Sequence, residues 1–306
     1  MTTYQIFNED CLLWLKRQPE NQYHAIVTDP PYGLVEYSNK ELEKMKNGVG
    51  GVWRIPPTIG GSKRNPLPRF TVLTESDLLD LSNFFTTWGS EALRVLVPGS
   101  HLIIASNPLM LPYLSMALIE AGFENRGAIV RLVRTLKGGF RPKLSEDEFQ
   151  EVSSIPRSCW EPWGLFRKPF KGRLSDNLRK WNTGGLRRNP DGTPFTDVIL
   201  SERTPVRERK IAQHPSLKPQ SFLRQVTYAA LPLGIGIILD PFCGSGSTLA
   251  AAEAIGYQSI GIEINPEYYK VASTAIPKLQ ALKIDPWSKK INQNSIQQTL
   301  ADANLW

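Results

Sequence analysis

Short apolar runs alternate with stretches of helical character along most of this chain. The runs that predict strands are YQIF (4–7), HAIV (24–27), HLIIAS (101–106), GIGIILD (234–240) and QSIGIEI (258–264). The stretches between them that are compatible with helices are 10–18, 76–96, 108–121, 218–231, 246–255 and 266–282. Such alternation is typical of an α/β fold with a doubly wound parallel sheet, because parallel strands need crossover helices. A further stretch, 123–135, predicts one or two strands and is compatible with an antiparallel edge.

The length and composition fit an ordinary globular protein. A chain of 306 residues can bury one large core, or one core and a smaller module. No apolar run approaches the roughly 18 residues of a membrane-spanning helix, so no membrane partner is expected. The first residues, MTTYQIFNEDC, lack the pattern of a secretory signal, so we expect a cytoplasmic location. The three cysteines and three histidines form no CxxC or HxxxH pair, which argues against a metal site.

Positive charge is concentrated in one part of the chain. Residues 131–210 contain 18 Lys and Arg against 10 Asp and Glu, a net charge of +8, whereas the rest of the chain carries −1. Such concentration indicates a polyanionic partner, most simply nucleic acid. The alternative is a basic face that is only solvated.

Two stretches interrupt the alternation of strands and helices. Residues 33–75 are rich in Gly, Pro, Lys and Asn and are long for a structureless connection, so we interpret them as a mobile insertion that forms a lid. Residues 136–213 mix Trp, Arg, Gly and Pro without periodicity, and we interpret them as an inserted module. The predicted organisation is one domain in two halves, 1–135 and 214–284, with that module between them and a polar tail at 285–306.

The sequence TDPPYG (28–33) directly follows one of the predicted strands. Two adjacent prolines remove backbone donors, so they end a strand rather than continue it. Asp29 and the ring of Tyr32 are thereby held at the carboxyl end of a strand, where open α/β sheets bind ligands. Taken alone, the same tetrapeptide is also compatible with an ordinary stop between a strand and a turn.

A glycine turn follows a later predicted strand, in LDPFCGSGSTLAA (239–252). Glycines permit a tight turn and a close approach of the backbone to a ligand. The turn is not a dinucleotide fingerprint, because Leu249 stands where the third glycine belongs, and it has no lysine for a P-loop. Glu263 ends the next strand, 17 residues past Gly246, where an acid can accept both hydroxyls of a ribose. The combination favours a nucleoside cofactor over a dinucleotide.

Four motifs together resemble the S-adenosylmethionine-dependent DNA amino-methyltransferases: DPPY (29–32), HPSLKP (214–219), DPFCGSGST (240–248) and GIE (261–263). Their order, with DPPY first, the basic segment second and the glycine turn last, is similar to that of the β-class, a circular permutation of the Rossmann-like methyltransferase fold. The matching pieces are 4–32, 91–107 and 214–270. The chain departs from the pattern at Ser247, where Gly or Thr is common, and in its long 33–75 stretch.

The resemblance implies S-adenosylmethionine as cofactor, double-stranded DNA as substrate and a target-recognition role for the 136–213 module. It is compatible with a homodimer and with a companion restriction endonuclease. It also implies a cofactor pocket. Asp240, Phe242, Gly244 and Gly246 would line the methionine part, Glu263 would hold the ribose, Asp10 would contact the adenine, and His214 and Lys218 with Pro219 would close over the carboxylate end. The alternatives are that Asp10 and Asp240 cap helices and that Lys218 is a surface charge.

The implied catalytic residues are Asp29, Pro30, Pro31 and Tyr32. The exocyclic amine of adenine or cytosine is a poor nucleophile, because its lone pair is delocalised into the ring. Acceptors on its two N–H groups, the Asp29 carboxylate and the Pro30 carbonyl, would free that lone pair. The stiff Pro-Pro pair would hold both acceptors in place, and Tyr32 would stack on a base flipped out of the duplex.

The segment 155–189 interleaves aromatic and basic side chains. Its cations predict phosphate and base contacts with DNA: Arg157, Arg167, Lys168, Lys171, Arg173, Arg179, Lys180, Arg187 and Arg188. We interpret its aromatic residues as the small core of the module rather than as stacking platforms.

The leading hypothesis is therefore a site-specific DNA methyltransferase acting on adenine N6, because in the family an Asp at the first catalytic position leans toward adenine. Cytosine N4 is the close alternative. A non-catalytic nucleic-acid-binding protein on a relict fold is more remote, since Asp29, Tyr32 and Glu263 are intact. RNA and protein-glutamine methyltransferases typically carry NPPY instead. A cytosine-C5 enzyme would need a nucleophilic cysteine, and Cys243 lies inside the cofactor turn.

Overall fold

The computed structural model describes residues 3–31, 75–133, 139, 141–142, 144–214 and 216–287, and the backbone of the short antiparallel strands β3 (Thr58–Ile59) and β4 (Ser62–Lys63). The predicted catalytic Tyr32, most of the predicted lid and most of the predicted tail lie outside the described residues.

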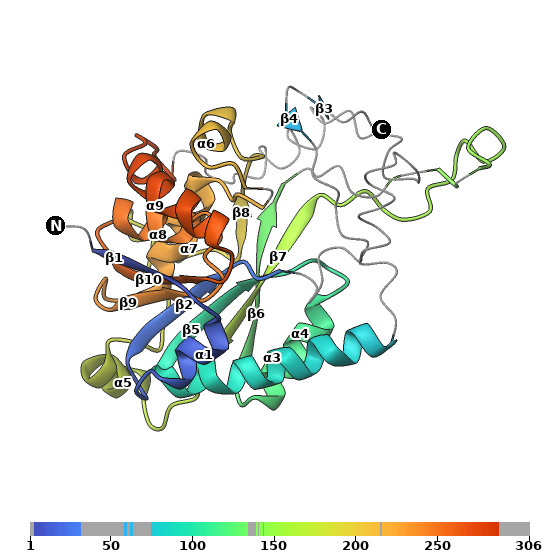
Figure 1. Ribbon diagram of the computed structural model, residues 1–306. Helices are drawn as coiled ribbons and strands as arrows, with labels where there is room; N and C mark the ends of the chain where they lie inside the picture. Colours follow the sequence, from blue (N-terminus) through green and yellow to red (C-terminus); the bar gives the residue numbers. More distant parts are fainter. Residues whose placement is uncertain are drawn as a thin grey trace.

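An eight-stranded sheet runs through the middle of the molecule (Figure 1). Its strands lie in the order β1 (Tyr4–Asn8), β10 (Gln258–Glu263), β9 (Ile237–Asp240), β2 (Tyr23–Thr28), β5 (Leu96–Ala105), β7 (Trp160–Arg167), β6 (Glu124–Leu132) and β8 (Val198–Leu200). Neighbouring strands are parallel except at β7, which is antiparallel to both β5 and β6. The predicted α/β fold with a doubly wound, largely parallel sheet is confirmed.

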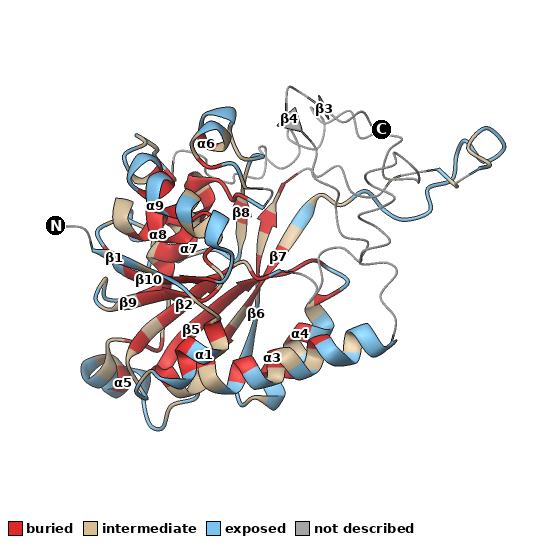
Figure 2. Cartoon of the chain, in the orientation of Figure 1, coloured by how far each residue is buried: buried red, intermediate tan, exposed pale blue. Residues whose placement is uncertain are grey.

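Helices cover both faces of the sheet (Figure 1). One face carries α1 (Cys11–Lys16), α3 (Glu75–Val95) and α4 (Leu111–Glu120), and the other carries α7 (Gln220–Ala230), α8 (Ser247–Ala254) and α9 (Pro266–Gln280). Two further helices, α5 (Leu174–Trp181) and α6 (Val206–Ile211), lie outside these layers. Buried residues fill the central strands β9, β2 and β5, whereas the residues of the edge strand β1 are intermediate or exposed (Figure 2).

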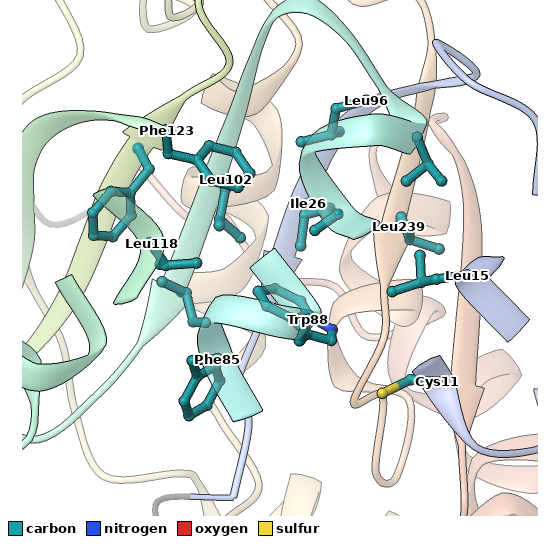
Figure 3. Packing of buried hydrophobic residues seen from close by; sticks show 14 of the residues in the cluster. Cys11, Leu15, Ile26, Phe85, Trp88, Leu96, Leu102, Leu118, Phe123 and Leu239 are labelled. Atoms are coloured by element: carbon teal, nitrogen blue, oxygen red, sulfur yellow. The ribbon is translucent and has the colours of Figure 1, made fainter. Parts of the chain in front are cut away.

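The side chains of β2 alternate between two cores. Ile26 packs with residues of α1, α3 and α4, whereas Ala25 and Val27 pack with residues of α7. Figure 3 shows the first core, in which Ile26 and the neighbouring strands' Leu102 and Leu239 gather around Trp88 of α3. A strand buried on both faces needs a continuous apolar run, which is why HAIV was recognisable in the sequence.

The second half of the sheet differs from what the sequence predicted. Residues 123–135 do not provide an antiparallel edge strand, because β6 lies inside the sheet between β7 and β8. The described part of 136–213 is not a separate module either, because β7 fills the gap between β5 and β6. Trp163 and Phe166 are fully buried, and they belong to the cores on opposite faces of the main sheet rather than to a core of their own.

No helix within the described ranges is both long and apolar enough to cross a membrane.

Candidate active site

The parallel strands bring three carboxylates to one edge of the sheet. Asp29 follows β2, Asp240 ends β9 and Glu263 ends β10, so all three lie at the carboxyl ends of strands. Thr28 Oγ1 donates a hydrogen bond to Asp240 Oδ1 at 2.6 Å and so joins the DPPY strand to the glycine turn. Residues far apart in the sequence thus form one site, at the edge where open α/β sheets bind ligands.

A pocket with about 320 Å³ of empty space, counted to its open mouth, lies at this edge. The end of β2 contributes Asp29, and residues 240–248 contribute most of the remaining wall. Trp163 of β7, Leu223 of α7 and the segment containing His214 and Lys218 complete it. The predicted catalytic acid and the predicted cofactor turn therefore line the same pocket.

Asp240 is a buried carboxyl group at the base of the glycine turn. It accepts hydrogen bonds from the Thr28 hydroxyl at 2.6 Å and from the Phe242 amide at 3.2 Å. Burial, with a smaller contribution from the nearby charge of Asp29, raises the pKa of Asp240 to about 7 even though the donors, which include Thr248, act to lower it. A carboxyl group under these conditions would be strongly stabilised as an anion by a cation in the pocket.

Two glycines shape the turn, and they do so for different reasons. Gly244 has φ +52°, and an added Cβ would lie 3.1 Å from His214 Nε2, so the missing side chain leaves room beside the pocket. Gly246 has φ +80°, and an added Cβ would lie 2.4 Å from Ile276 Cγ1 of α9. Gly246 therefore faces α9 rather than lining the predicted methionine site. A glycine is needed at this position so that the start of α8 can pack against α9.

Glu263 and Asp10 already hold backbone amides. The two carboxylate oxygens of Glu263 accept from the amides of Gly244 and Asn265, each at 2.8 Å. Each oxygen retains further lone-pair capacity, so ribose hydroxyls remain acceptable partners. Asp10 accepts from the Leu13 amide at 3.0 Å and caps α1, which confirms the alternative interpretation of this residue as a helix cap. Its contact with adenine stays a prediction.

Ile264 is an exposed apolar residue that the sequence analysis did not single out. It follows Glu263 directly, and 65% of it is exposed at the cofactor edge. An apolar surface beside a ribose acceptor suits the flat face of a purine. The available signal was an isoleucine placed just after the strand, where a polar residue is more common.

His214 and Phe242 form apolar parts of the wall. The ring of His214 lies edge-on to Tyr268, with 4.3 Å between centroids, and its Nδ1 accepts from the Ser216 amide at 3.2 Å. Burial, aided by the charge of Lys218, lowers the pKa of His214 to about 4, so this imidazole is neutral near pH 7. Phe242 packs on Trp88 of α3, with 5.5 Å between centroids.

Lys218 is not the surface charge that the sequence left open, because only 9% of its side chain is exposed. Its Nζ lies 2.5 Å from Asp29 Oδ2 and 3.8 Å from Glu161 Oε1. The ammonium is therefore directed at the predicted catalytic acid, whereas the resemblance had placed it at the carboxylate end of the cofactor. Glu161, on β7, was missed. Its signal was an acid in WEPWGLFR, where the chain is otherwise aromatic, apolar or basic.

Cys243 has the character of a structural thiol. Burial raises its pKa well above the ordinary value, and the charges of Asp240 and Glu263 raise it further. A buried protonated thiol is a poor nucleophile, which agrees with the rejection of a C5-type mechanism. Among the described residues, no group of three or more His, Cys, Asp or Glu could hold a metal ion.

The antiparallel direction of β7 separates most of the predicted DNA-binding cations from this site. β7 begins at the edge that carries Asp29 and ends at the opposite, amino edge of the sheet. There Lys168 Nζ donates to the Leu96 carbonyl at 2.7 Å, and Asn177 of α5 donates to the Pro98 carbonyl at 2.9 Å. Since β2 crosses the sheet in the six residues Tyr23–Thr28, about 17 Å of strand separate the two edges.

Several of these cations also have structural partners at the amino edge. Arg167 pairs with Glu124 at 2.6 Å, and Arg187 donates to the Tyr257 hydroxyl at 2.6 Å while stacking over Tyr228. The predicted DNA-binding cations at the end of β7 or after it are Arg167, Lys168, Lys171, Arg173, Arg179, Lys180, Arg187 and Arg188. At the amino edge these cations lie too far from the pocket to contact DNA that is held over the active site, so their predicted role does not fit the structure. Arg157, which precedes β7 and is exposed, lies toward the active-site edge.

The fold and site define a class of protein. Solved structures with this fold include a putative DNA modification methylase from Thermus thermophilus complexed with S-adenosyl-L-methionine (TM-score 0.55, 19% identity, covering 91% of this chain and 95% of that one). The cytosine-N4-specific PvuII DNA methyltransferase is also similar (TM-score 0.57, 13% identity, covering 97% of this chain and 91% of that one). The class is that of α/β proteins with this Rossmann-like fold.

Sequence comparison makes the assignment specific. The M2.LlaDCHI type II methyltransferase of Lactococcus lactis subsp. cremoris is 35% identical over 277 residues, 85% of this chain and 96% of that protein. The M.HindIII type II methyltransferase of Haemophilus influenzae is 25% identical over 293 residues, 87% of this chain and 93% of that protein. The family model for N6/N4 methyltransferases, described as DNA methylase, matches residues 23–274. The chain belongs to this family of S-adenosylmethionine-dependent DNA amino-methyltransferases.

Proposed function

We propose that the protein transfers a methyl group to the N6 amine of adenine at a specific sequence in double-stranded DNA, with the target base turned out of the duplex. One observation carries this proposal. Asp29 of the DPPY sequence and Gly244 of the glycine turn line the same pocket, so an amine held by the first would lie beside a cofactor held by the second. The Asp at the first position of DPPY favours adenine by resemblance within the family.

The role of Asp29 follows from the electronics of the target. The lone pair of an exocyclic amine is delocalised into the ring, and acceptors on its N–H groups would shift the nitrogen toward a tetrahedral shape. Asp29 and the carbonyl of Pro30 offer two such acceptors at the rigid end of β2. The Asp29 carboxylate could also take the proton that the nitrogen loses after methylation. Holding both acceptors in advance lowers the reorganisation needed during reaction.

The residues of the glycine turn fit the cofactor of the family. Glu263 offers acceptors for ribose hydroxyls, Ile264 offers an apolar surface for a purine, and Asp240 offers a buried carboxyl group that a cationic group would stabilise as an anion. S-adenosylmethionine, when bound, supplies the methyl group on its sulfonium. The chain's contribution is to hold that methyl group in line with the amine and to exclude water. Such positioning by itself accelerates the transfer, because the two reacting groups no longer have to find each other in solution.

The DNA surface belongs, on this proposal, to the edge that carries the pocket. The segment between β6 and β7 projects from that edge, and its described residues are largely exposed (Figures 1 and 2). Arg157 lies on it, beside Gly139. A duplex resting there could reach the pocket with a single extruded base.

Nucleoside analysis of DNA from cells that express the protein tests this function. We expect N6-methyladenine in one sequence context with the wild type, and none with Asp29→Ala. The variant should still bind S-adenosylmethionine in calorimetry and should melt cooperatively. N4-methylcytosine in place of N6-methyladenine would assign the alternative target base, and unchanged methylation by Asp29→Ala would refute the role of the carboxylate.

A further inference from the structure

The pocket contains a chain of three charges, of which the proposed reaction uses only Asp29. Lys218 Nζ lies 2.5 Å from Asp29 Oδ2 and 3.8 Å from Glu161 Oε1, so one ammonium lies between two carboxylates. The side chains are 9%, 16% and 19% exposed for Lys218, Asp29 and Glu161 respectively. Because water screens such partly buried groups weakly, these charges influence one another strongly.

Glu161 and Asp29 are each positioned by the sheet. Glu161 Oε1 accepts from Trp163 Nε1 at 2.8 Å, and Oε2 pairs with Arg131 Nη1 at 3.3 Å. Arg131 is itself fixed, because it donates to Ser201 Oγ at 2.9 Å and to the Glu202 carbonyl at 2.8 Å. Asp29 is set by the end of β2 and the prolines that follow. Lys218, by contrast, carries its charge on a flexible four-carbon stem.

The ammonium at Asp29 conflicts with the chemistry proposed for that residue. An N–H of the lysine already occupies Asp29 Oδ2, one of the oxygens that would accept from the target amine. During methyl transfer the amine nitrogen also gains positive charge, and an adjacent ammonium would repel it. A shift of roughly 1 Å would bring Nζ to the usual distance for a charged hydrogen bond to Glu161.

We propose that the Lys218 ammonium occupies the position of the target amine against Asp29 while the pocket is empty of base, and that it moves to Glu161 when the base enters. This inference rests on the proposed function of Asp29. It makes Glu161 a positioning residue that acts through Lys218, and it assigns Lys218 to the target-base side of the pocket rather than to the cofactor. Entry of a base that carries an exocyclic amine would exchange one N–H donor for another at Asp29, without leaving the carboxylate unsatisfied.

A double-mutant cycle in single-turnover methylation tests the proposal, on a duplex whose sequence is read from the methylated DNA. Glu161→Gln should slow the plateau rate by at least about tenfold, the scale on which small misplacements act, because the lysine then stays at Asp29. Lys218→Met removes the group that must move. In that background Glu161→Gln should change the rate by less than about twofold, since the two changes are coupled.

The pH profile gives a second readout that a purely structural role would not move. Lys218→Met should shift the acidic limb of kcat/KM to higher pH, because Asp29 loses its cation, whereas Glu161→Gln should leave that limb in place or shift it lower. Glu124→Gln and Lys168→Met are matched controls, since each alters a charged group at the amino edge; both should retain the wild-type profile.

The outcomes separate this inference from the function beneath it. An equal loss of rate from Glu161→Gln with and without Lys218 would overturn the movement of Lys218 while leaving a methyltransferase in place. An inactive wild type, or an active Asp29→Ala, would overturn the proposed function itself. Cofactor affinity, measured by calorimetry, should stay within about twofold in all single variants, and a large loss in Lys218→Met would return that residue to the cofactor site.

Discussion

Asp240 connects the stability of the molecule to pH at the scale of one residue. Its folded pKa of about 7 lies above the ordinary value of 3.8, so the protonated form is favoured by the fold. Stability from this group is fully present below about pH 4 and is lost as the pH rises toward 7. The loss could reach roughly 4 kcal/mol, at about 1.4 kcal/mol for each unit.

We therefore expect the unfolding free energy of the wild type to fall between pH 4 and 7 relative to that of Asp240→Asn, which cannot ionise. The asparagine oxygen can still accept from Thr28 and Phe242, so the local hydrogen bonds are kept. Urea titrations of both proteins across this range measure the difference. Parallel profiles would show that Asp240 ionises as freely in the folded state as in the unfolded one.

At the scale of the element, α8 depends on the glycine at its beginning. Gly246→Ala places a Cβ against Ile276, whereas Gly256, just past the end of α8, has nearly the same φ of +79° and no atom within 4 Å of an added Cβ. Gly256→Ala should lower the free energy of unfolding by about 1 kcal/mol, because alanine is strained in the left-handed conformation. Gly246→Ala should lower the free energy of unfolding by about 2–4 kcal/mol, because the new methyl group also overpacks against α9. Denaturant unfolding of the pair isolates the packing contribution, and equal losses would contradict it.

At the scale of the whole molecule, most of the cations predicted to bind DNA lie at the edge of the sheet opposite the pocket. Arg157 and Arg188 are both exposed, but only Arg157 precedes β7 and lies toward the pocket. Arg157→Gln should therefore weaken DNA binding. It should also reduce the slope of log affinity against log salt by about 0.9, the change expected when one phosphate contact is lost. Arg188→Gln should leave both unchanged. The reverse pattern in fluorescence anisotropy titrations would return the DNA surface to the amino edge.

The parallel half of this sheet was predictable from sequence for a physical reason. Strands such as β2 are buried on both faces and appear as unbroken apolar runs, and the groups that follow them must meet at one edge. That logic brought Asp29, Asp240 and Glu263 together correctly. β7 was not recognisable, because Pro162 and Gly164 interrupt it and charged residues lie at both its ends. β7 is buried because its neighbouring strands and helices cover it. Its antiparallel direction decides where the following cations lie, and no local sequence pattern indicates that direction.

The pairing of β2 with β9 also has a consequence for synthesis of the protein on the ribosome. Thr28 and Asp240 are 212 positions apart, yet they meet in a buried hydrogen bond beside the pocket. At about 5 to 20 residues per second, the translating ribosome needs about 10 to 40 s to supply the second after the first. Throughout that interval one edge of β2 lacks its native neighbour, so the nascent chain is a natural client for chaperones. A transcript cut short before β9 would yield a chain with the predicted catalytic acid but without the predicted cofactor turn, so we expect premature fragments to be unable to methylate DNA.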